Sequence, residues 1–296
     1  MSVLEFTKLE LNHIPLIRPF FLRQNRRICD CTIGSTLMWR DYFDNCFAVV
    51  EDTLIFRSRY LDGDFAFTVP IGKEPERMLG LLEEYCREQG VAPVFCTVTP
   101  NDLELLRKRW TDLTVEENRD WFDYLYESRD IVEFAGRKYA AQRNHIHRFE
   151  RDHPDWSFAP MTLNDIEEVR VFYQWFLQER NKEGSTAQAE VGKIFEVLDH
   201  FEEYAFLGGI LRAEGKIVGI SMGEIVQDTL FVHIEKADVQ YQGVYQKLVN
   251  CFAKEFVTDE VRYINREEDV GDPGLRKSKL SYRPVALQEK YTVRVK

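Results

Sequence analysis

One predicted strand carries side chains that could exchange protons with a substrate. Alternation along Thr229–Ala237 places Phe231, His233 and Glu235 on one face. A histidine can take a proton from an amine or hydroxyl nucleophile while a carboxylate orients its ring. We therefore expect His233 and Glu235 to act as base and orienter, with Glu224 as a further catalytic candidate. The competing interpretation is a strand histidine that is simply hydrogen-bonded within the fold.

A second candidate site is the basic segment 136–152, in a chain whose formal net charge is −11. As a helix it places Tyr139, Ile146 and Phe149 on an apolar face and cationic side chains on another. Such cations can hold the phosphates of a cofactor or of an RNA backbone. The alternative is a solvated face paired with acidic residues. The expected donor- or phosphate-binding residues here are Arg137, Lys138, Arg143, Asn144 and Arg148.

A third segment, Gln240–Tyr245, lies between a predicted strand and a predicted helix. In GNAT acetyltransferases the pattern Q/R-x-x-G-x-G/A stands here, and its backbone N–H groups bind a pyrophosphate. Gln240 and Gly243 keep the first part of this pattern and are candidate phosphate ligands, whereas Tyr245 replaces the second small residue. A bulky Tyr245 would crowd a pyrophosphate. A glycine that only opens a core helix is the competing interpretation.

A fourth segment, 265–279, mixes acidic and basic residues directly after a predicted buried strand. The carboxyl ends of strands are where open α/β sheets bind their ligands. Carboxylates here would bind a substrate amine, and cations would bind phosphate or carboxylate. An ordinary surface connection is the alternative. We expect Asn265, Glu267, Glu268 and Asp269 to bind an acceptor and Lys277 to bind phosphate.

Two similar predicted lobes must position these segments. Each half has a helix, three short strands, a helix and a strand, the order of the GNAT fold. The first half has strands at Cys46–Glu51, Thr53–Tyr60 and Asp64–Val69, with a turn at Asp62-Gly63. The second has them at Ala205–Arg212, Lys216–Val226 and Thr229–Ala237. We expect an α/β fold with mixed sheets, formed by two tandem GNAT-like lobes at 1–135 and 136–296, the second beginning with the basic helix.

Composition excludes several classes of protein. Hydrophobic residues make up 44% and charged residues 30%, as in folded globular proteins. The chain has no secretion-signal pattern and no apolar run of the roughly 20 residues that cross a bilayer, so we expect a cytoplasmic protein that does not span a membrane. None of the six cysteines forms a CxxC pair, so we expect no metal site.

An ordered set of motifs carries a family resemblance. The motifs are GRKYAAQRNHIHRF, GISMGE, VHIEKA, YQGVYQ, YINREEDVG and GLRKSKLSYRP. Together they resemble the phosphatidylglycerol lysyltransferase C-terminal domain family, in its soluble branch, over nearly the whole chain. The resemblance implies two tandem GNAT lobes and kinship with enzymes that move an aminoacyl group from charged tRNA to a lipid or a peptide amine, including the Fem-type transferases. It also marks the basic helix and the 265–271 loop as functional positions.

The resemblance and the residues together lead to a functional expectation. We expect an acyltransferase that moves an aminoacyl group from aminoacyl-tRNA, bound through the local basic patch, to an amine or hydroxyl acceptor. The acceptor would be a small molecule, a peptide or a lipid headgroup, and no cofactor would be bound tightly. An acyl-CoA-dependent N-acetyltransferase, with acetyl-CoA as donor, and a non-catalytic binding module on the same fold are the alternatives.

Overall fold

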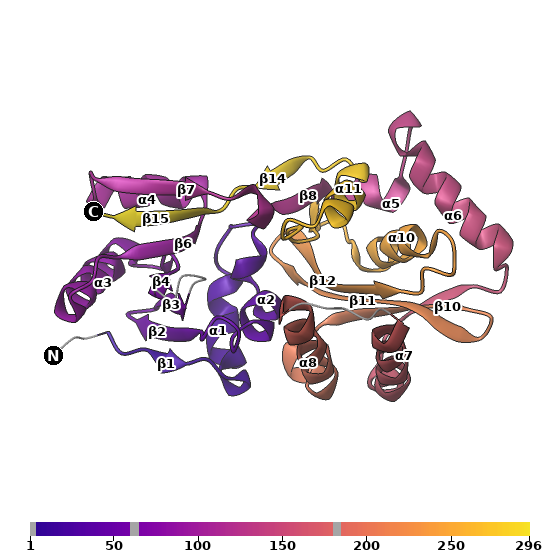
Figure 1. Ribbon diagram of the computed structural model, residues 1–296, viewed down its shortest axis with the longest axis horizontal. Helices are drawn as coiled ribbons and strands as arrows, with labels where there is room; N and C mark the ends of the chain where they lie inside the picture. The colour runs from indigo at the N-terminus through magenta and orange to yellow at the C-terminus, as the bar shows by residue number, and fades with distance from the viewer. Residues whose placement is uncertain (1–3, 60–64, 180–184) are drawn as a thin grey trace. The chain divides into compact units, whose positions relative to one another are not determined.

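The computed structural model describes residues 4–59, 65–179 and 185–296 of a mixed α/β chain (Figure 1). The chain divides into two compact units. The first comprises residues 1–123, 268–273 and 287–296, and the second comprises residues 124–267 and 274–286. The turn expected at Asp62-Gly63 lies outside the described residues.

The first unit contains a mixed sheet with the strand order β1-β2-β3-β4-β6-β15-β7, and β5 pairs with β3. Strands β2, β3 and β4 form an antiparallel meander, and β6 runs parallel to β4. The strands are β1 (Thr7–Lys8), β2 (Cys46–Val50), β3 (Thr53–Arg59), β4 (Phe65–Phe67), β5 (Ile71–Gly72), β6 (Val94–Val98), β7 (Leu113–Glu117) and β15 (Tyr291–Val295). The helices are α1 (Ile14–Phe21), α2 (Ile33–Met38), α3 (Pro75–Gln89) and α4 (Pro100–Arg109).

Helices α3 and α4 form where the sequence provides both a start signal and an apolar face. Helix α3 buries Met78, Leu79 and Leu82 in a core shared with the sheet, and it ends at Gly90, whose φ is +70°. Helix α4 begins at a capping box in which Thr99 and Asp102 bond each other's backbone N–H groups. Helix α3 therefore ends, and helix α4 begins, at a defined position beside the sheet.

The second unit contains the sheet order β14-β8-β13-β12-β11-β10-β9. In Figure 1, α10 lies on one side of this sheet, and α7 and α8 lie on the other. The strands are β8 (Asp123–Glu127), β9 (Ser157–Pro160), β10 (Leu207–Ala213), β11 (Lys216–Val226), β12 (Thr229–Ala237), β13 (Tyr263–Asn265) and β14 (Ala286–Gln288). The helices are α5 (Ser128–Glu133), α6 (Ala140–Asp152), α7 (Ile166–Glu179), α8 (Ser185–Asp199), α9 (Phe201–Tyr204), α10 (Val244–Phe256) and α11 (Pro273–Ser281).

The two units repeat one arrangement. In each, an antiparallel meander is followed by a helix and then by a strand parallel to the last strand of the meander. The parallel pairs are β4 with β6 and β12 with β13. This is the order of a GNAT lobe, so the prediction of a mixed α/β fold with two tandem GNAT-like lobes is confirmed.

The division of the chain differs from the boundary expected between residues 135 and 136. Residues 124–135, which include α5 and most of β8, belong to the second unit because β8 pairs with β13 there. Residues 287–296 belong to the first unit because β15 pairs with β6 and β7 (Figure 1). A long-range strand pairing of this kind leaves no local signal in the sequence. Separately, none of the helices in the described part of the chain has the length and apolar composition needed to cross a membrane.

Candidate active site

Three sequence-predicted residues meet in the second unit as a buried carboxylate–histidine–carboxylate group, hereafter the His233 triad. His233 Nε2 lies 3.1 Å from a carboxylate oxygen of Glu224, and Nδ1 lies 2.8 Å from a carboxylate oxygen of Glu267. The side chain of His233 is 1% exposed, that of Glu224 6% and that of Glu267 23%. Glu267 is therefore the member of the triad that solvent reaches most readily.

A β-bulge places His233. The register of β11 against β12 shifts between Met222 and Gly223, so that β12 carries one extra residue, His233, at that point. Gly223 allows the close approach of the two strands, because an added Cβ would lie 2.0 Å from the carbonyl oxygen of Phe231. Bulges of this kind redirect side chains and are frequent beside active sites. The interior glycine next to Glu224 is thus a geometric requirement of the triad.

Glu267 reaches His233 from the end of the parallel strand β13. Phe231 on β12 pairs with Asn265, the last residue of β13. The buried Asn265 side chain then accepts a hydrogen bond of 2.7 Å from the N–H of Glu267. Lys279, which is also buried, donates to the carbonyl oxygen of Glu267 at 3.2 Å. Asn265, expected to bind an acceptor, makes a hydrogen bond that positions Glu267.

The charges of the triad follow from these contacts. Burial alone would lower the pKa of His233, but the hydrogen bonds from its ring to Glu224 and Glu267 outweigh this and raise it to about 9. Near neutral pH the ring is therefore an imidazolium that donates to both carboxylates. The three groups together carry a formal charge of −1. His233 consequently holds two carboxylates in place, which differs from the general-base role expected from the sequence.

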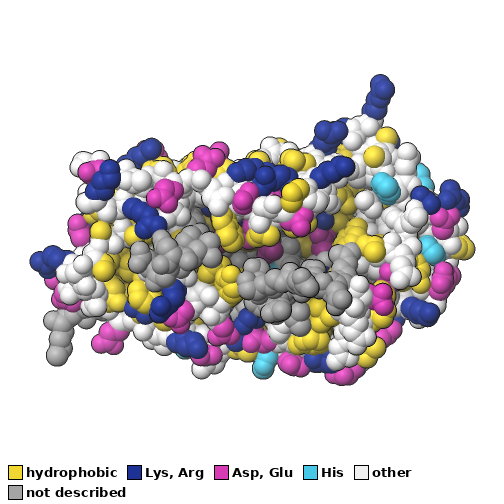
Figure 2. All heavy atoms as spheres, viewed as in Figure 1, with side chains coloured by type: hydrophobic (Ala, Val, Ile, Leu, Met, Phe, Trp, Pro, Cys, Tyr) yellow, Lys and Arg dark blue, Asp and Glu magenta, His cyan; other side chains and the backbone are white. Residues whose placement is uncertain are grey.

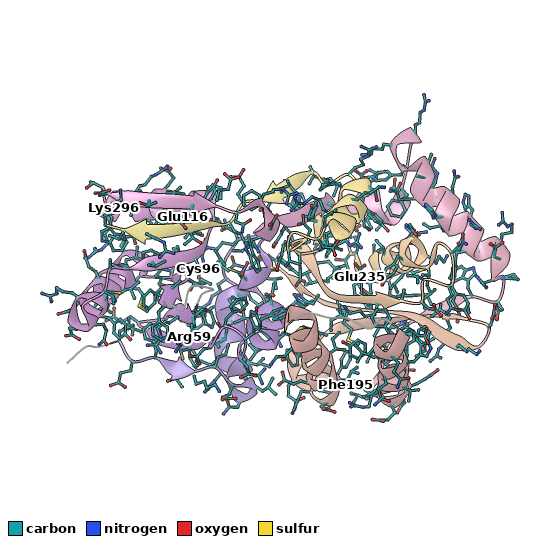
Figure 3. All side chains as sticks on the ribbon, in the orientation of Figure 1. Arg59, Cys96, Glu116, Phe195, Glu235 and Lys296 are labelled. Carbon is teal, nitrogen blue, oxygen red and sulfur yellow. The ribbon has the colours of Figure 1, made fainter. Side chains whose placement is uncertain are left out.

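Glu235 has a different partner from the one expected. Figure 3 labels Glu235 on β12. Its carboxylate accepts two hydrogen bonds from the guanidinium of Arg266, at 2.7 and 3.0 Å. Arg266 is buried and its guanidinium carbon lies 4.5 Å from the ring centre of Tyr282. The ring nitrogens of His233 bond Glu224 and Glu267, so Glu235 forms an ion pair instead of orienting the histidine. Sequence reasoning missed Arg266, which stands inside the charged segment already singled out.

The remaining acidic candidates, Glu268 and Asp269, belong to the first unit. Asp269 is fully buried and lies 3.4 Å from the guanidinium of Arg119. Glu268 belongs to a cluster with Cys29 and Asp123, whose potential metal-ligating atoms lie within 4.8 Å of one another. The buried Lys290 ammonium lies 2.7 Å from Asp123 and 3.5 Å from Glu268. An ammonium therefore supplies positive charge to this cluster.

The basic segment places its cations at the surface, with one exception. Figure 2 shows Lys, Arg and His side chains interspersed with Asp and Glu over the end of the second unit that carries α6. Lys138 lies 2.7 Å from Asp130, whereas the guanidinium of Arg143 donates to the carbonyl oxygens of Phe134 and Gly136. Arg143 therefore stabilises the turn after α5. The other phosphate-binding candidates on exposed positions are Arg137, Asn144, Arg148, Gln240 and Lys277.

Gly243 is explained by packing against α6. Its φ is +89°, and an added Cβ would lie 2.2 Å from the carbonyl oxygen of His145. The hydroxyl of Tyr245 accepts a hydrogen bond from the N–H of Ala237 at 3.3 Å. The backbone of α6 thus packs against the residue that opens α10, where a pyrophosphate would approach. This geometry disfavours the interpretation of 240–245 as a CoA-binding loop.

Comparison with known proteins adds to this geometry. The model of a family described as phosphatidylglycerol lysyltransferase, C-terminal, matches residues 23–294. A crystal structure of a conserved protein of unknown function from Bacteroides thetaiotaomicron is similar over 99% of this chain and all of that one, with 32% identity and a TM-score of 0.91. The structure of L-PGS from Bacillus licheniformis covers 95% of this chain and 91% of its own, at 15% identity and a TM-score of 0.65. FemX covers 97% and 96%, at 6% identity and a TM-score of 0.62. The last two likenesses show a shared fold.

Proposed function

This chain belongs to the phosphatidylglycerol lysyltransferase C-terminal family, and on that premise we propose that it transfers an aminoacyl group from aminoacyl-tRNA to an amine or hydroxyl acceptor. In this reaction the acceptor attacks the ester carbonyl carbon, and a new C–N or C–O bond forms. The bond from that carbon to the ribose oxygen breaks, and the proton lost by the acceptor ends on that oxygen. Because the ester is activated, positioning and charge stabilisation account for most of the required rate enhancement.

The observation that carries the proposal is the His233 triad. It places a carboxylate, Glu267, at the more exposed edge of a buried group whose formal charge is −1. Such a carboxylate attracts the ammonium of an aminoacyl group or an amine acceptor, and it can receive the proton released on attack. His233 and Glu224 are positioning residues, because they hold Glu267 and need not touch the substrate. Asn265 and Lys279 fix the backbone of Glu267.

The exposed cations of the basic segment support a nucleic-acid donor. Arg137, Lys138 and Arg148 lie on or just before α6 and reach solvent. Phosphate contacts by such side chains release counterions, so binding of tRNA should weaken steeply as salt rises. Replacing all three by glutamine should reduce both the affinity and its salt dependence. Arg143, which bonds backbone carbonyl groups, is left unchanged in this variant to preserve the fold.

The test uses purified full-length protein and bulk tRNA charged with labelled amino acids, with ethanolamine and glycerol as simple amine and hydroxyl acceptors. The measured quantities are the loss of label from tRNA and its appearance in an amide or ester product. Glu267→Gln should lower the transfer rate about 100-fold, the scale of a lost proton acceptor. Glu255→Gln, which changes an exposed carboxylate on α10, is the matched control and should leave the rate unchanged.

Two outcomes would count against the proposal. One is a Glu267→Gln variant that retains wild-type turnover, since the carboxylate would then play no part. The other is wild-type protein that accelerates neither transfer nor hydrolysis of the charged tRNA. A parallel titration with CoA should show no binding at millimolar concentration, because α6 packs against Gly243. Saturable CoA binding would instead favour an acyl-CoA-dependent enzyme.

A further inference from the structure

The first unit contains a cavity of about 540 Å³ at the ends of two parallel strands. The chain after β4 lines it with Pro70 and Ile71, and the chain after β6 lines it with Thr99 and Pro100. Ligands of open α/β sheets bind outside the carboxyl ends of parallel strands. The volume lies within the range of small-molecule sites. Position and size both favour a bound molecule.

The charge of this cavity is opposite to that of the chain. Arg23, Arg26, Arg27 and Lys73 line it, and among the described residues that line it Asp102 is the one acid. The chain as a whole has a formal net charge of −11. Four cations around one cavity in such a chain form a local excess of positive charge. This excess favours an anionic ligand.

Arg26 is held in place by a network of its own. Its guanidinium donates to both carboxylate oxygens of Asp102, at 2.6 and 2.8 Å, and to the carbonyl oxygen of Pro70 at 3.2 Å. The hydroxyl of Thr99 donates to Asp102 at 2.7 Å. The side chain of Arg26 is 15% exposed. Its planar group is therefore fixed at the cavity wall before any ligand arrives.

A second carboxylate, Asp52, orders two more of the cations. Arg23 donates to it at 2.9 and 3.0 Å, and the Lys73 ammonium lies 2.8 Å away. The hydrogen bonds from Arg23 and Lys73 lower the pKa of Asp52 to about 2, so it stays ionised. Among the described residues, Arg23 and Lys73 thus share one carboxylate, and these three groups together carry a formal charge of +1. The N-terminus of α3 reaches the cavity at Pro75 without a side-chain cap, and Glu76 in its first turn offsets part of the positive end of the helix.

We propose that this cavity binds a phosphate-bearing small molecule of nucleotide size. The phosphate would lie among Arg23, Arg27 and Lys73, three cations of the cavity lining whose N–H groups are suitable donors to phosphate oxygens. The remainder of the ligand would pack against the apolar wall formed by Ile71 and Leu105. This site lies wholly in the first unit and plays no part in the aminoacyl transfer proposed above, so it is a binding activity additional to that function.

Isothermal titration calorimetry of the full-length protein at low salt tests this inference, with pyrophosphate, ADP and adenosine as probes. Pyrophosphate and ADP should bind saturably at one site, and adenosine, which lacks phosphate, should not. The double variant Arg27→Gln/Lys73→Gln should weaken both affinities by roughly ten-fold or more. Lys108→Gln, which changes an exposed lysine near the end of α4, is the control and should leave them unchanged.

The inference is overturned if wild-type protein binds neither pyrophosphate nor ADP up to millimolar concentration. It is equally overturned if the control weakens binding as much as the double variant, because the attraction would then be unspecific. Both variants keep Arg26 and Asp102, so the buried ion pair and the fold remain, and unchanged melting temperatures would verify this. Since the readout is binding, the result stands apart from any outcome of the aminoacyl-transfer assay.

Discussion

The His233 triad makes stability depend on pH in a direction that can be worked out. The pKa of His233 is raised from the ordinary 6.5 to about 9 in the folded protein. The folded chain therefore holds this proton more tightly than the unfolded chain does. The resulting stabilisation is fully present below pH 6.5 and is lost as the pH rises through about 9. A histidine without such partners would show no such loss in this window.

The size of the effect follows from the same shift. The difference between 6.5 and about 9 corresponds to about 3 kcal/mol of unfolding free energy. Solvent screening reduces this free energy only slightly, because the His233 side chain is 1% exposed. The stabilisation comes from the bonds to Glu224 and Glu267, which outweigh the cost of burying the imidazolium. In the variant His233→Gln this contribution is absent at every pH.

Urea unfolding of the wild type and of His233→Gln at pH 7 and pH 10 measures the effect. The difference in unfolding free energy between the two proteins should shrink by about 2.5 kcal/mol over this interval, because part of the stabilisation is already lost at pH 7. An NMR titration of the imidazole protons in the wild type should have its midpoint near pH 9, and Glu224→Gln should move that midpoint down. A difference that stays constant or widens, or a midpoint near 6.5, would refute the reasoning.

Two further predictions concern stability. Gly243→Ala should lower the free energy of unfolding by more than about 2 kcal/mol, because a positive φ and a backbone clash with α6 act together. Gly215 also has a positive φ, of +70°, but an added Cβ there would meet open space. Gly215→Ala should therefore lower the free energy of unfolding by only about 1 kcal/mol. If thermal denaturation showed the same loss of stability in both glycine variants, the clash with α6 would not be the cause. Lys290→Met should cost about 3–5 kcal/mol, because it leaves the buried Asp123 without its ammonium, while the exposed Lys296→Met should change stability by less than about 0.5 kcal/mol. A small loss in Lys290→Met would show that the cluster is not held by this charge.

Much of the fold could be predicted because its signals are local. The strands Lys216–Val226 and Thr229–Ala237 are separated by a short turn, and the prediction reproduced both sets of bounds. The helix after each meander begins close to a glycine, a proline or a cap that marks its start. The boundary between the units could not be predicted, because β15 pairs with strands far from it in sequence. Pairing partners at long range leave no trace in a local pattern.

The roles of His233 and Glu235 show where strict alternation fails. Two residues apart on a regular strand, they would share one face and could form a pair. The bulge inserts His233 as an extra residue, and its ring bonds Glu224 while Glu235 bonds Arg266. Gly223 in the preceding strand was the available signal, because an interior strand glycine often marks a bulge. The structure shows why glycine is required there, because the carbonyl oxygen of Phe231 lies where a Cβ of residue 223 would stand.

The acidic loop shows why neighbours in sequence need not form one site. Glu267 and Glu268 are adjacent carboxylates that the sequence assigned to one acceptor-binding group. Glu267 has a φ of +55°, and its side chain bonds His233 in the second unit. Glu268 lies 3.5 Å from Lys290 in the first unit. A residue in the left-handed region turns the chain sharply, so successive side chains diverge. The loop therefore supplies one carboxylate to the His233 triad and another to a buried lysine, and charge composition alone could not have separated these two roles.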